Sequence, residues 1–228
     1  MIPLKDENPA QLTPYVNYAI ITLCVLVFLW QFSLGPVRGQ RAVYALGAIP
    51  AVLFGNVRLP DELALISPWM SVLTSMFLHG GWMHLLGNML YLWIFGDNIE
   101  DSMGHARYFI FYVLCGLAAV LAQALPDQGS QVPMIGASGA ISGVLGAYLL
   151  LYPRARIHVI IPLGFIFQRA RLPAMWVLLF WFALQLLSNL LQGTAGAGVA
   201  FRAHIGGFVA GLALIPLFKY RNVQLLRP

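Results

Sequence analysis

Two side chains suited to covalent catalysis lie within strongly apolar stretches of the sequence. Ser138 lies in the motif Gly-Ala-Ser-Gly at 136–139, and His204 lies in Ala-His-Ile-Gly-Gly at 203–207. A serine hydroxyl is a weak nucleophile until a neighbouring base takes its proton, and neutral imidazole is the side chain best matched to that task at physiological pH. The pair predicts Ser138 as nucleophile and His204 as general base.

His84 and Asn88 add the hydrogen-bond donors that acyl transfer requires. The two residues are four apart, so on a helix they share one face. Together with the backbone N–H of Ser138 they could bind the oxyanion of a tetrahedral intermediate. We therefore expect His84 and Asn88 in an oxyanion hole.

Carboxylates are poorly placed to extend this pair into a triad. Asp97, Glu100 and Asp101 fall at the far end of an apolar stretch, and Asp127 falls in a connection. A Ser-His dyad is therefore the better interpretation than a triad with an acidic third member. No His-Glu-x-x-His pair occurs and the histidines do not cluster with carboxylates in ligand spacing, so we expect no metal site.

The composition indicates that these groups act inside a membrane. Hydrophobic residues make up 60% of the 228 residues and charged residues 9%, and the mean hydropathy is +0.78. A membrane-crossing helix needs about 20 mostly apolar residues. Six apolar stretches meet this description approximately: 16–34, 81–97, 106–125, 136–152, 172–191 and 201–218. The sequence predicts an all-α membrane protein with one six-helix domain at 16–218, a cytoplasmic tail at 1–15 and another at 219–228.

The positive charges predict the orientation of these spans. If the spans alternate, one side carries nine lysines and arginines and the other side carries four, Arg38, Arg41, Arg58 and Arg202. Cytoplasmic connections are enriched in such residues, so both termini are expected in the cytoplasm. The second, fourth and sixth spans then enter from the outer face, which gives His84, Ser138 and His204 a similar depth. Polar side chains at that depth tend to face a cavity or one another.

Two features of the remaining chain bear on how the spans pack. Residues 35–80 form a long connection between the first two spans, rich in proline among apolar pieces, and we expect it to lie partly in the outer interface. Residues 157–167 are apolar but too short to cross, and Pro162 and Gly164 would break a helix, so they are expected to line the cytoplasmic interface. Glycines spaced by four, at 139 and 143 and at 207 and 211, would let the fourth and sixth spans approach closely.

These motifs resemble those of the rhomboid intramembrane serine proteases. The resemblance rests on His-Gly-Gly-Trp-Met-His-Leu-Leu-Gly-Asn at 79–88, on Gly-Ala-Ser-Gly at 136–139 and on Ala-His-Ile-Gly-Gly-Phe-Val-Ala-Gly at 203–211. It implies a bacterial-type six-helix rhomboid fold, with Ser138 and His204 as dyad and His84 and Asn88 in the oxyanion hole.

The resemblance also implies a substrate and a setting. The substrates would be transmembrane segments of single-pass membrane proteins, cut in or next to the bilayer, without a cofactor or a nucleic-acid partner. The chain would be a multi-pass protein of the bacterial inner membrane.

Alternatives remain open at this point. In some rhomboids an aromatic residue four positions after the nucleophile packs against the imidazole, whereas this chain has Ser142 there. The sequence therefore leaves open how His204 is held, and it leaves the role of Arg202 open too. A catalytically silent relative, or an unrelated channel or transporter, would use the same polar layer to bind or pass membrane clients. Gly-x-Ser-Gly taken alone is more often a helix-packing motif than a nucleophile.

Overall fold

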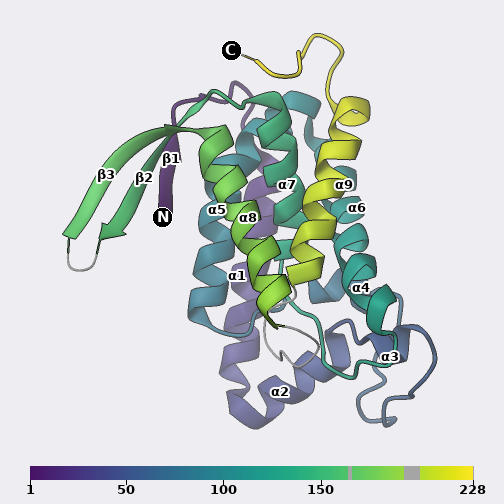
Figure 1. Ribbon diagram of the computed structural model, residues 1–228. Coiled ribbons are helices and arrows are strands. Elements are labelled where there is room, and N and C mark those ends of the chain that lie inside the picture. Colours follow the sequence, from purple (N-terminus) through teal and green to yellow (C-terminus); the bar gives the residue numbers. More distant parts are fainter. Residues whose placement is uncertain (164–165, 193–200, 228) are drawn as a thin grey trace.

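The computed structural model describes residues 1–163, 166–192 and 201–227 and is predominantly helical (Figure 1). Within these ranges the long helices are α1 (Tyr15–Ser33), α5 (Trp82–Met103), α6 (His105–Ala124), α7 (Ser138–Leu151), α8 (Ala174–Gln192) and α9 (Phe201–Phe218). The shorter elements are α2 (Gly35–Leu46), α3 (Pro50–Leu53), α4 (Met70–Ser75) and the 3-10 turn η1 (Leu125–Asp127). The strands of these described ranges are β1 (Ile2–Asp6), β2 (Arg156–Leu163) and β3 (Ile166–Pro173).

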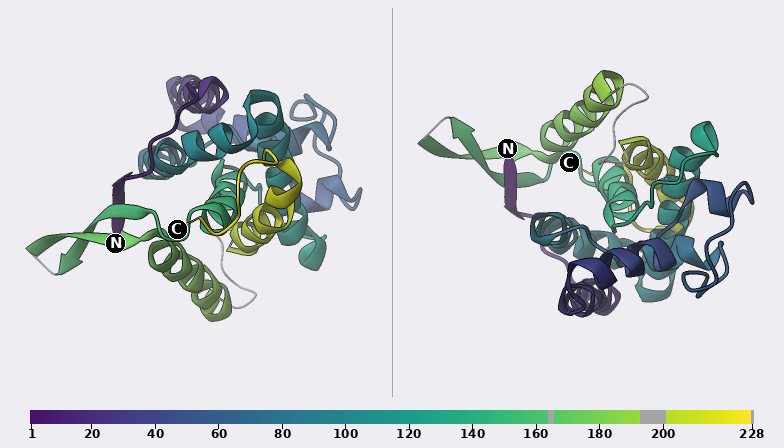
Figure 2. Two further views of the ribbon diagram at one scale, coloured as in Figure 1. Left: turned by 90° about the horizontal axis from the view of Figure 1, so that it is seen from above. Right: turned by 90° about the horizontal axis from the view of Figure 1, so that it is seen from below.

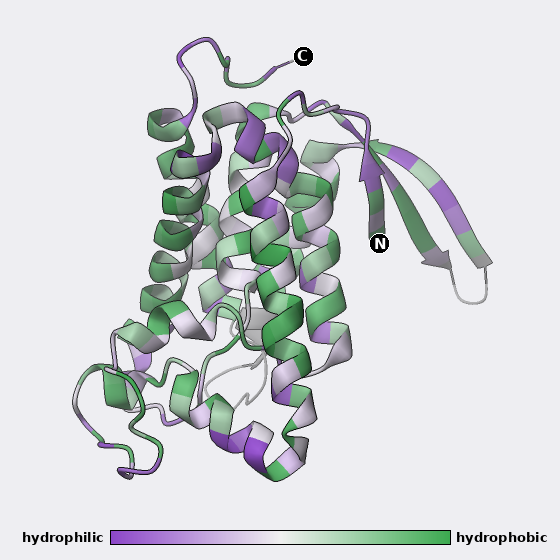
Figure 3. Cartoon of the chain, turned by 180° about the vertical axis from the view of Figure 1, so that it is seen from behind, coloured by the Kyte–Doolittle hydropathy of each residue, from purple (hydrophilic) through white to green (hydrophobic). Residues whose placement is uncertain are grey.

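Three helical stretches of the described chain are long and apolar enough to cross a membrane. They are Tyr15–Ser33, His105–Asp127 and Phe201–Phe218. Helix α7 is apolar but has only 14 residues, and α5 carries three acidic residues in its last turns. Each of the six expected ranges overlaps a long helix, while a count of six membrane crossings stays a prediction. Figure 3 shows that hydrophilic residues gather toward the two ends of the helices and on the sheet.

The expectation of an all-α chain is wrong, because the protein contains a three-stranded sheet in the order β1-β2-β3. The connection expected to lie along the interface is an antiparallel hairpin of β2 and β3. Its sequence alternates with the period of a strand: Ile157 and Val159 are buried, with 0% and 1% exposure, and Arg156, His158 and Ile160 are more exposed. The N-terminal segment, expected to be a tail, adds β1 antiparallel to β2.

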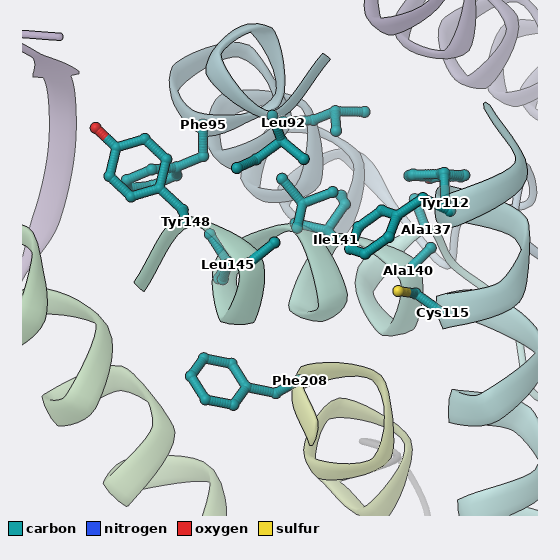
Figure 4. Close-up of a cluster of buried hydrophobic side chains, with 14 of the residues drawn as sticks. Leu92, Phe95, Tyr112, Cys115, Ala137, Ala140, Ile141, Leu145, Tyr148 and Phe208 are labelled. Carbon is teal, nitrogen blue, oxygen red and sulfur yellow. The ribbon is translucent and has the colours of Figure 1, made fainter. Parts of the chain in front are cut away.

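Helix α7 is the centre of the helical body. Eleven of its 14 residues are buried, which shields its backbone from lipid. Figure 4 shows Ile141 and Leu145 of α7 among side chains of the neighbouring helices, such as Leu92 of α5, Tyr112 of α6 and Phe208 of α9.

Glycines allow α7 and α9 to pack with their backbones almost in contact. A Cβ added at Gly207 would collide with the carbonyl oxygen of Gly139, and one added at Gly211 would collide with that of Gly143. Neither carbonyl can move without disturbing α7 itself. The close approach of these two helices therefore depends on the missing side chains.

We expect Gly211→Ala to lower the stability of the purified protein in detergent by about 1 to 3 kcal/mol, the usual cost of an overpacked contact. The matched control is Gly87→Ala in α5, because a Cβ at Gly87 would meet no atom within 4 Å. Unfolding midpoints of the two variants measure the difference. Equal midpoints would show that α7 and α9 are not held by this glycine contact.

The N-terminal strand is joined to the helices through a half-buried carboxylate. The Oδ2 atom of Asp6 accepts hydrogen bonds from the Tyr148 hydroxyl at 2.6 Å and from Asn98 Nδ2 at 3.0 Å. Burial raises the pKa of Asp6 to about 6, and the hydrogen bond from Tyr148 opposes this shift only in part. Asp6 therefore holds its proton more tightly in the folded protein than in the unfolded chain.

This pKa predicts a pH dependence of stability. Since the folded-state pKa is raised above the unfolded value, the contribution of Asp6 is present below about pH 4 and is lost as the pH rises through about 6. We expect the unfolding midpoint of the wild type to fall relative to that of Asp6→Asn as the pH rises from about 4 to about 6.5, with little further change above that range. Asp61→Asn, at an exposed loop position, should track the wild type throughout. A constant gap between wild type and Asp6→Asn would contradict the assignment.

Candidate active site

The candidate residues lie at the beginnings of three helices. His84 is the third residue of α5, Ser138 is the first of α7 and His204 is the fourth of α9. These helices begin at the end of the helical body that is opposite the sheet (Figure 1). The structure thus places these three side chains at the same end of the molecule.

Ser138 and His204 lie within hydrogen-bonding distance of each other. The Oγ atom of Ser138 is 2.8 Å from Nε2 of His204. The contact joins α7 to α9, the pair of helices that the glycines bring together. This geometry suits transfer of the serine proton to the imidazole.

Gln185 of α8 holds the other nitrogen of the same imidazole. Its Oε1 atom lies 2.7 Å from Nδ1 of His204. An amide oxygen can only accept a hydrogen bond, so Nδ1–H donates and Nε2 is left with a lone pair for the Ser138 hydroxyl. The expectations from sequence do not include Gln185. The available signal was one amide within the otherwise apolar stretch 174–187.

Aromatic rings also border the imidazole. The ring centroid of Trp181 lies 6.0 Å and that of Phe201 6.3 Å from the ring of His204. Ser142, which stands where some rhomboids have an aromatic residue, instead donates a hydrogen bond of 2.6 Å to the carbonyl of Ser138. The ring of His204 is therefore oriented by side chains of α8 and of its own helix α9, and not by residue 142.

The carboxylates at the sheet end of α5 serve another purpose. The side chain of Glu100 accepts hydrogen bonds from the N–H groups of Val16 and Asn17, at 3.0 and 2.7 Å. Asp101 accepts one from the N–H of Leu12 at 2.9 Å. Both carboxylates thus bind the chain at and just before the first turn of α1, where unpaired backbone donors favour acceptors.

His84 presents a hydrogen-bond donor near Ser138. Its Nδ1 atom accepts a hydrogen bond from the N–H of Gly80 at 3.2 Å, so in the neutral ring Nε2 carries the proton. This nitrogen faces Gly136, where a Cβ would lie 2.7 Å from it. Gly136 has φ +118, a backbone conformation that side chains disfavour. The buried ring of His79 packs against His84, with centroids 5.1 Å apart.

Asn88 contributes a second donor at the same place. Its Nδ2 atom is buried and has no hydrogen-bond partner within the described residues. A Cβ at Gly136 would lie 3.7 Å from this nitrogen. An unpaired buried donor is costly, and such groups occur where a ligand or reacting atom completes the hydrogen bond. The donors of His84 and Asn88 therefore converge on Gly136, two residues before Ser138.

Metal ligands do not gather in the described part of the chain. Across residues 1–163, 166–192 and 201–227, no three His, Cys, Asp or Glu side chains are grouped so that they could hold a metal ion.

Comparison with known proteins adds independent evidence. A family model described as Rhomboid domain matches residues 67–221. RHOMBOID-like protein 5 of Arabidopsis thaliana is 31% identical over 163 residues, 69% of this chain and 48% of that protein. Rhomboid protein 1, mitochondrial, of Saccharomyces cerevisiae is 29% identical over 194 residues, 76% of this chain and 52% of that protein. Rhomboid protease GluP of Bacillus subtilis is 32% identical over 136 residues, 60% of this chain and 24% of that protein. The chain thus spans about half or less of the length of these relatives.

Proposed function

The chain belongs to the rhomboid family, and on that premise we propose that it is an intramembrane serine protease with Ser138 as nucleophile and His204 as general base. The observation that carries the proposal is the distance of 2.8 Å between Ser138 Oγ and His204 Nε2. The amide of Gln185 and the two donors that converge on Gly136 support it.

The reaction follows from these positions. Ser138 Oγ attacks the carbonyl carbon of the scissile bond while its proton passes to Nε2 of His204. The carbonyl oxygen becomes an oxyanion, which accepts hydrogen bonds from His84 Nε2–H, Asn88 Nδ2–H and the N–H of Ser138.

Collapse of this intermediate breaks the C–N bond, and the proton on His204 passes to the leaving nitrogen. The acyl group stays on Ser138 as an ester. A water molecule then attacks the ester carbon, gives its proton to His204, and the proton returns to Oγ as the new carboxyl group leaves.

We propose transmembrane segments of single-pass membrane proteins as substrates. A helical segment keeps its carbonyls hydrogen bonded and shielded, so the substrate must unwind near the site. Small or helix-breaking residues in the substrate, close to the membrane face nearest Ser138, would lower the free energy needed to unwind the helix. Water must also reach Ser138, which is the first residue of α7.

Membership of the family makes the chain a membrane protein. The bacterial inner membrane expected from the sequence is not supported, because the relatives come from a plant, from yeast mitochondria and from a bacterium and do not agree on one membrane. Six crossings within 16–218, flanked by tails at 1–15 and 219–228, with both termini in the cytoplasm, remain our proposal. It is favoured by the excess of positive charge at the end that carries the sheet.

Reconstitution with a single-pass reporter in proteoliposomes tests the function. We expect the wild type to cut the reporter near one end of its transmembrane segment, and Ser138→Ala to leave it intact. If wild type and Ser138→Ala gave the same products, the activity would belong to a contaminant and the protein would be a client-binding relative.

Gln185 has a role that activity can separate from packing. Gln185→Leu keeps the size of the side chain but removes the acceptor for His204 Nδ1–H, and we expect a fall in kcat of about 10- to 100-fold with little change in KM. Gln185→Glu keeps an acceptor oxygen and should recover most of the activity. If Leu and Glu variants were equally active, or equally impaired, the side chain would not orient the base.

A further inference from the structure

The three-stranded sheet has one face against the helices and one face away from them. Paired residues on neighbouring strands point to the same side of a sheet, and successive residues of one strand point to opposite sides. One row consists of Pro3, Val159 and Ala170, and the next of Asp6, Ile157 and Leu172. These rows contain the buried positions, so they form the inner face.

The outer face is formed by the alternate rows. They contain Ile2, Ile160 and Arg169 in one row and Lys5, His158 and Arg171 in the next, with Arg156 and Phe167 at the two ends. Lys5, Arg156, Arg169 and Arg171 are all exposed. We call these eight residues the basic face.

The basic face has few negative charges of its own. Glu7 follows β1 and lies 2.6 Å from His158 Nε2 and 3.6 Å from Arg171. No other acidic side chain of the described residues lies within ion-pair distance of the four cations. The face therefore keeps a strong positive charge next to apolar surface: Phe167 is 68% exposed and Ile2 47% exposed.

The position of the hairpin relates the basic face to the membrane surface. Figure 1 shows β2 and β3 leaving the ends of α7 and α8 that lie far from Ser138, and Figure 2 shows the hairpin extending sideways beyond the helices. The hairpin starts at the height at which these helices leave the lipid, and it bends along their side, so that its far end lies nearer to their mid-height than its start does (Figure 1). Phe167, toward the far end of the hairpin, lies farther from the helices than the arginines do.

We propose that the basic face binds the anionic lipid headgroups of the adjacent leaflet, with Phe167 reaching into the acyl region and the arginines pairing with phosphates. Cations beside apolar side chains match the chemistry of an interface where charge lies next to hydrocarbon. A guanidinium binds phosphate through two parallel hydrogen bonds, which suits Arg169 and Arg171. The lipid surface is also the one partner that is always present at this height.

A fluorescent label at residue 167 tests this contact without any need for proteolysis. Phe167→Cys carries an NBD group, and the native Cys24 and Cys115 are fully buried, so unmodified protein serves as the labelling blank. The protein is placed, one chain per disc, in nanodiscs of phosphatidylcholine, with or without phosphatidylglycerol. We expect a blue shift and protection from iodide in discs with phosphatidylglycerol, both reduced by high salt.

Neutralising the arginines should remove the effect. Each basic residue at an anionic surface strengthens binding about five-fold, so Arg169→Gln with Arg171→Gln should weaken it about 25-fold. Arg38→Gln with Arg58→Gln makes the same charge change at exposed positions of the other end and should leave the label protected. Unfolding midpoints in detergent verify that both double variants are folded.

Three outcomes would overturn the proposal. The label could be equally exposed in both lipid mixtures, or equally protected in the presence and absence of Arg169 and Arg171. It could also become protected only in discs with two chains, which would assign the face to a second copy. None of these outcomes bears on cleavage by Ser138, so the protease proposal is tested separately.

Discussion

Replacing His204 by Ala is expected to lower the rate of reporter cleavage by about 10⁴-fold or more, as is replacing Ser138 by Ala. The reason is the contact of 2.8 Å between Oγ and Nε2, through which the hydroxyl loses its proton during attack. Because the two groups perform one step, the double variant should be no slower than either single variant. The measurement is the initial rate of cleavage in proteoliposomes under single-turnover conditions.

Ser142→Ala is the matched control for these variants. Ser142 lies one turn further along α7, and its hydroxyl binds the Ser138 carbonyl rather than the imidazole. We expect Ser142→Ala to stay within about tenfold of the wild type, since a single neutral hydrogen bond contributes about 1 kcal/mol. If the fold-reductions in cleavage rate caused by Ser138→Ala and His204→Ala multiplied in the double variant, the two side chains would act in separate steps.

Removing either donor near Gly136 is expected to have the second largest effect. Asn88→Ala and His84→Ala should each lower kcat by about 10²- to 10³-fold, the usual cost of one oxyanion donor. KM should change little, because the oxyanion exists only in the transition state and the intermediates. Asn88 Nδ2 has no hydrogen-bond partner within the described residues. His84 carries its proton on Nε2, because its Nδ1 accepts a hydrogen bond from the N–H of Gly80.

His84→Gln distinguishes a donor from a packing role. A glutamine keeps an N–H donor on a side chain of similar reach and should recover part of the rate that His84→Ala loses. His158→Ala, in the sheet, controls for the loss of a histidine elsewhere. If Asn88→Ala raised KM and left kcat unchanged, these donors would contact the bound substrate and not the oxyanion.

The sequence was informative about the site because lipid makes polar residues conspicuous. Ser138 and His204 stand out within apolar stretches, and their places in those stretches predicted a common depth. The glycine spacing likewise predicted the approach of α7 and α9, since only the missing Cβ atoms permit it. These features are local, so they can be read from a single chain.

The features that the sequence analysis missed depend on contacts between distant segments. β1 pairs with a strand about 150 residues later, and Asp6 meets Tyr148 and Asn98 only once the helices are packed. The hairpin was not predicted, because a short apolar segment that contains a proline, here Pro162, is also typical of a loop. Gln185 was missed because an amide in an apolar stretch acquires its role only from the facing residue, here His204.

Labelling with a fluorophosphonate, followed by mass spectrometry of the modified peptide, tests the central claim most directly. The reagent reacts with a serine hydroxyl that a neighbouring base has activated, and it requires no substrate. We expect the adduct on Ser138 in the wild type and in Ser142→Ala, and its loss in His204→Ala. Equal labelling of Ser138 in the wild type and in His204→Ala, or no adduct on Ser138 in a folded and reconstituted wild type, would contradict the dyad.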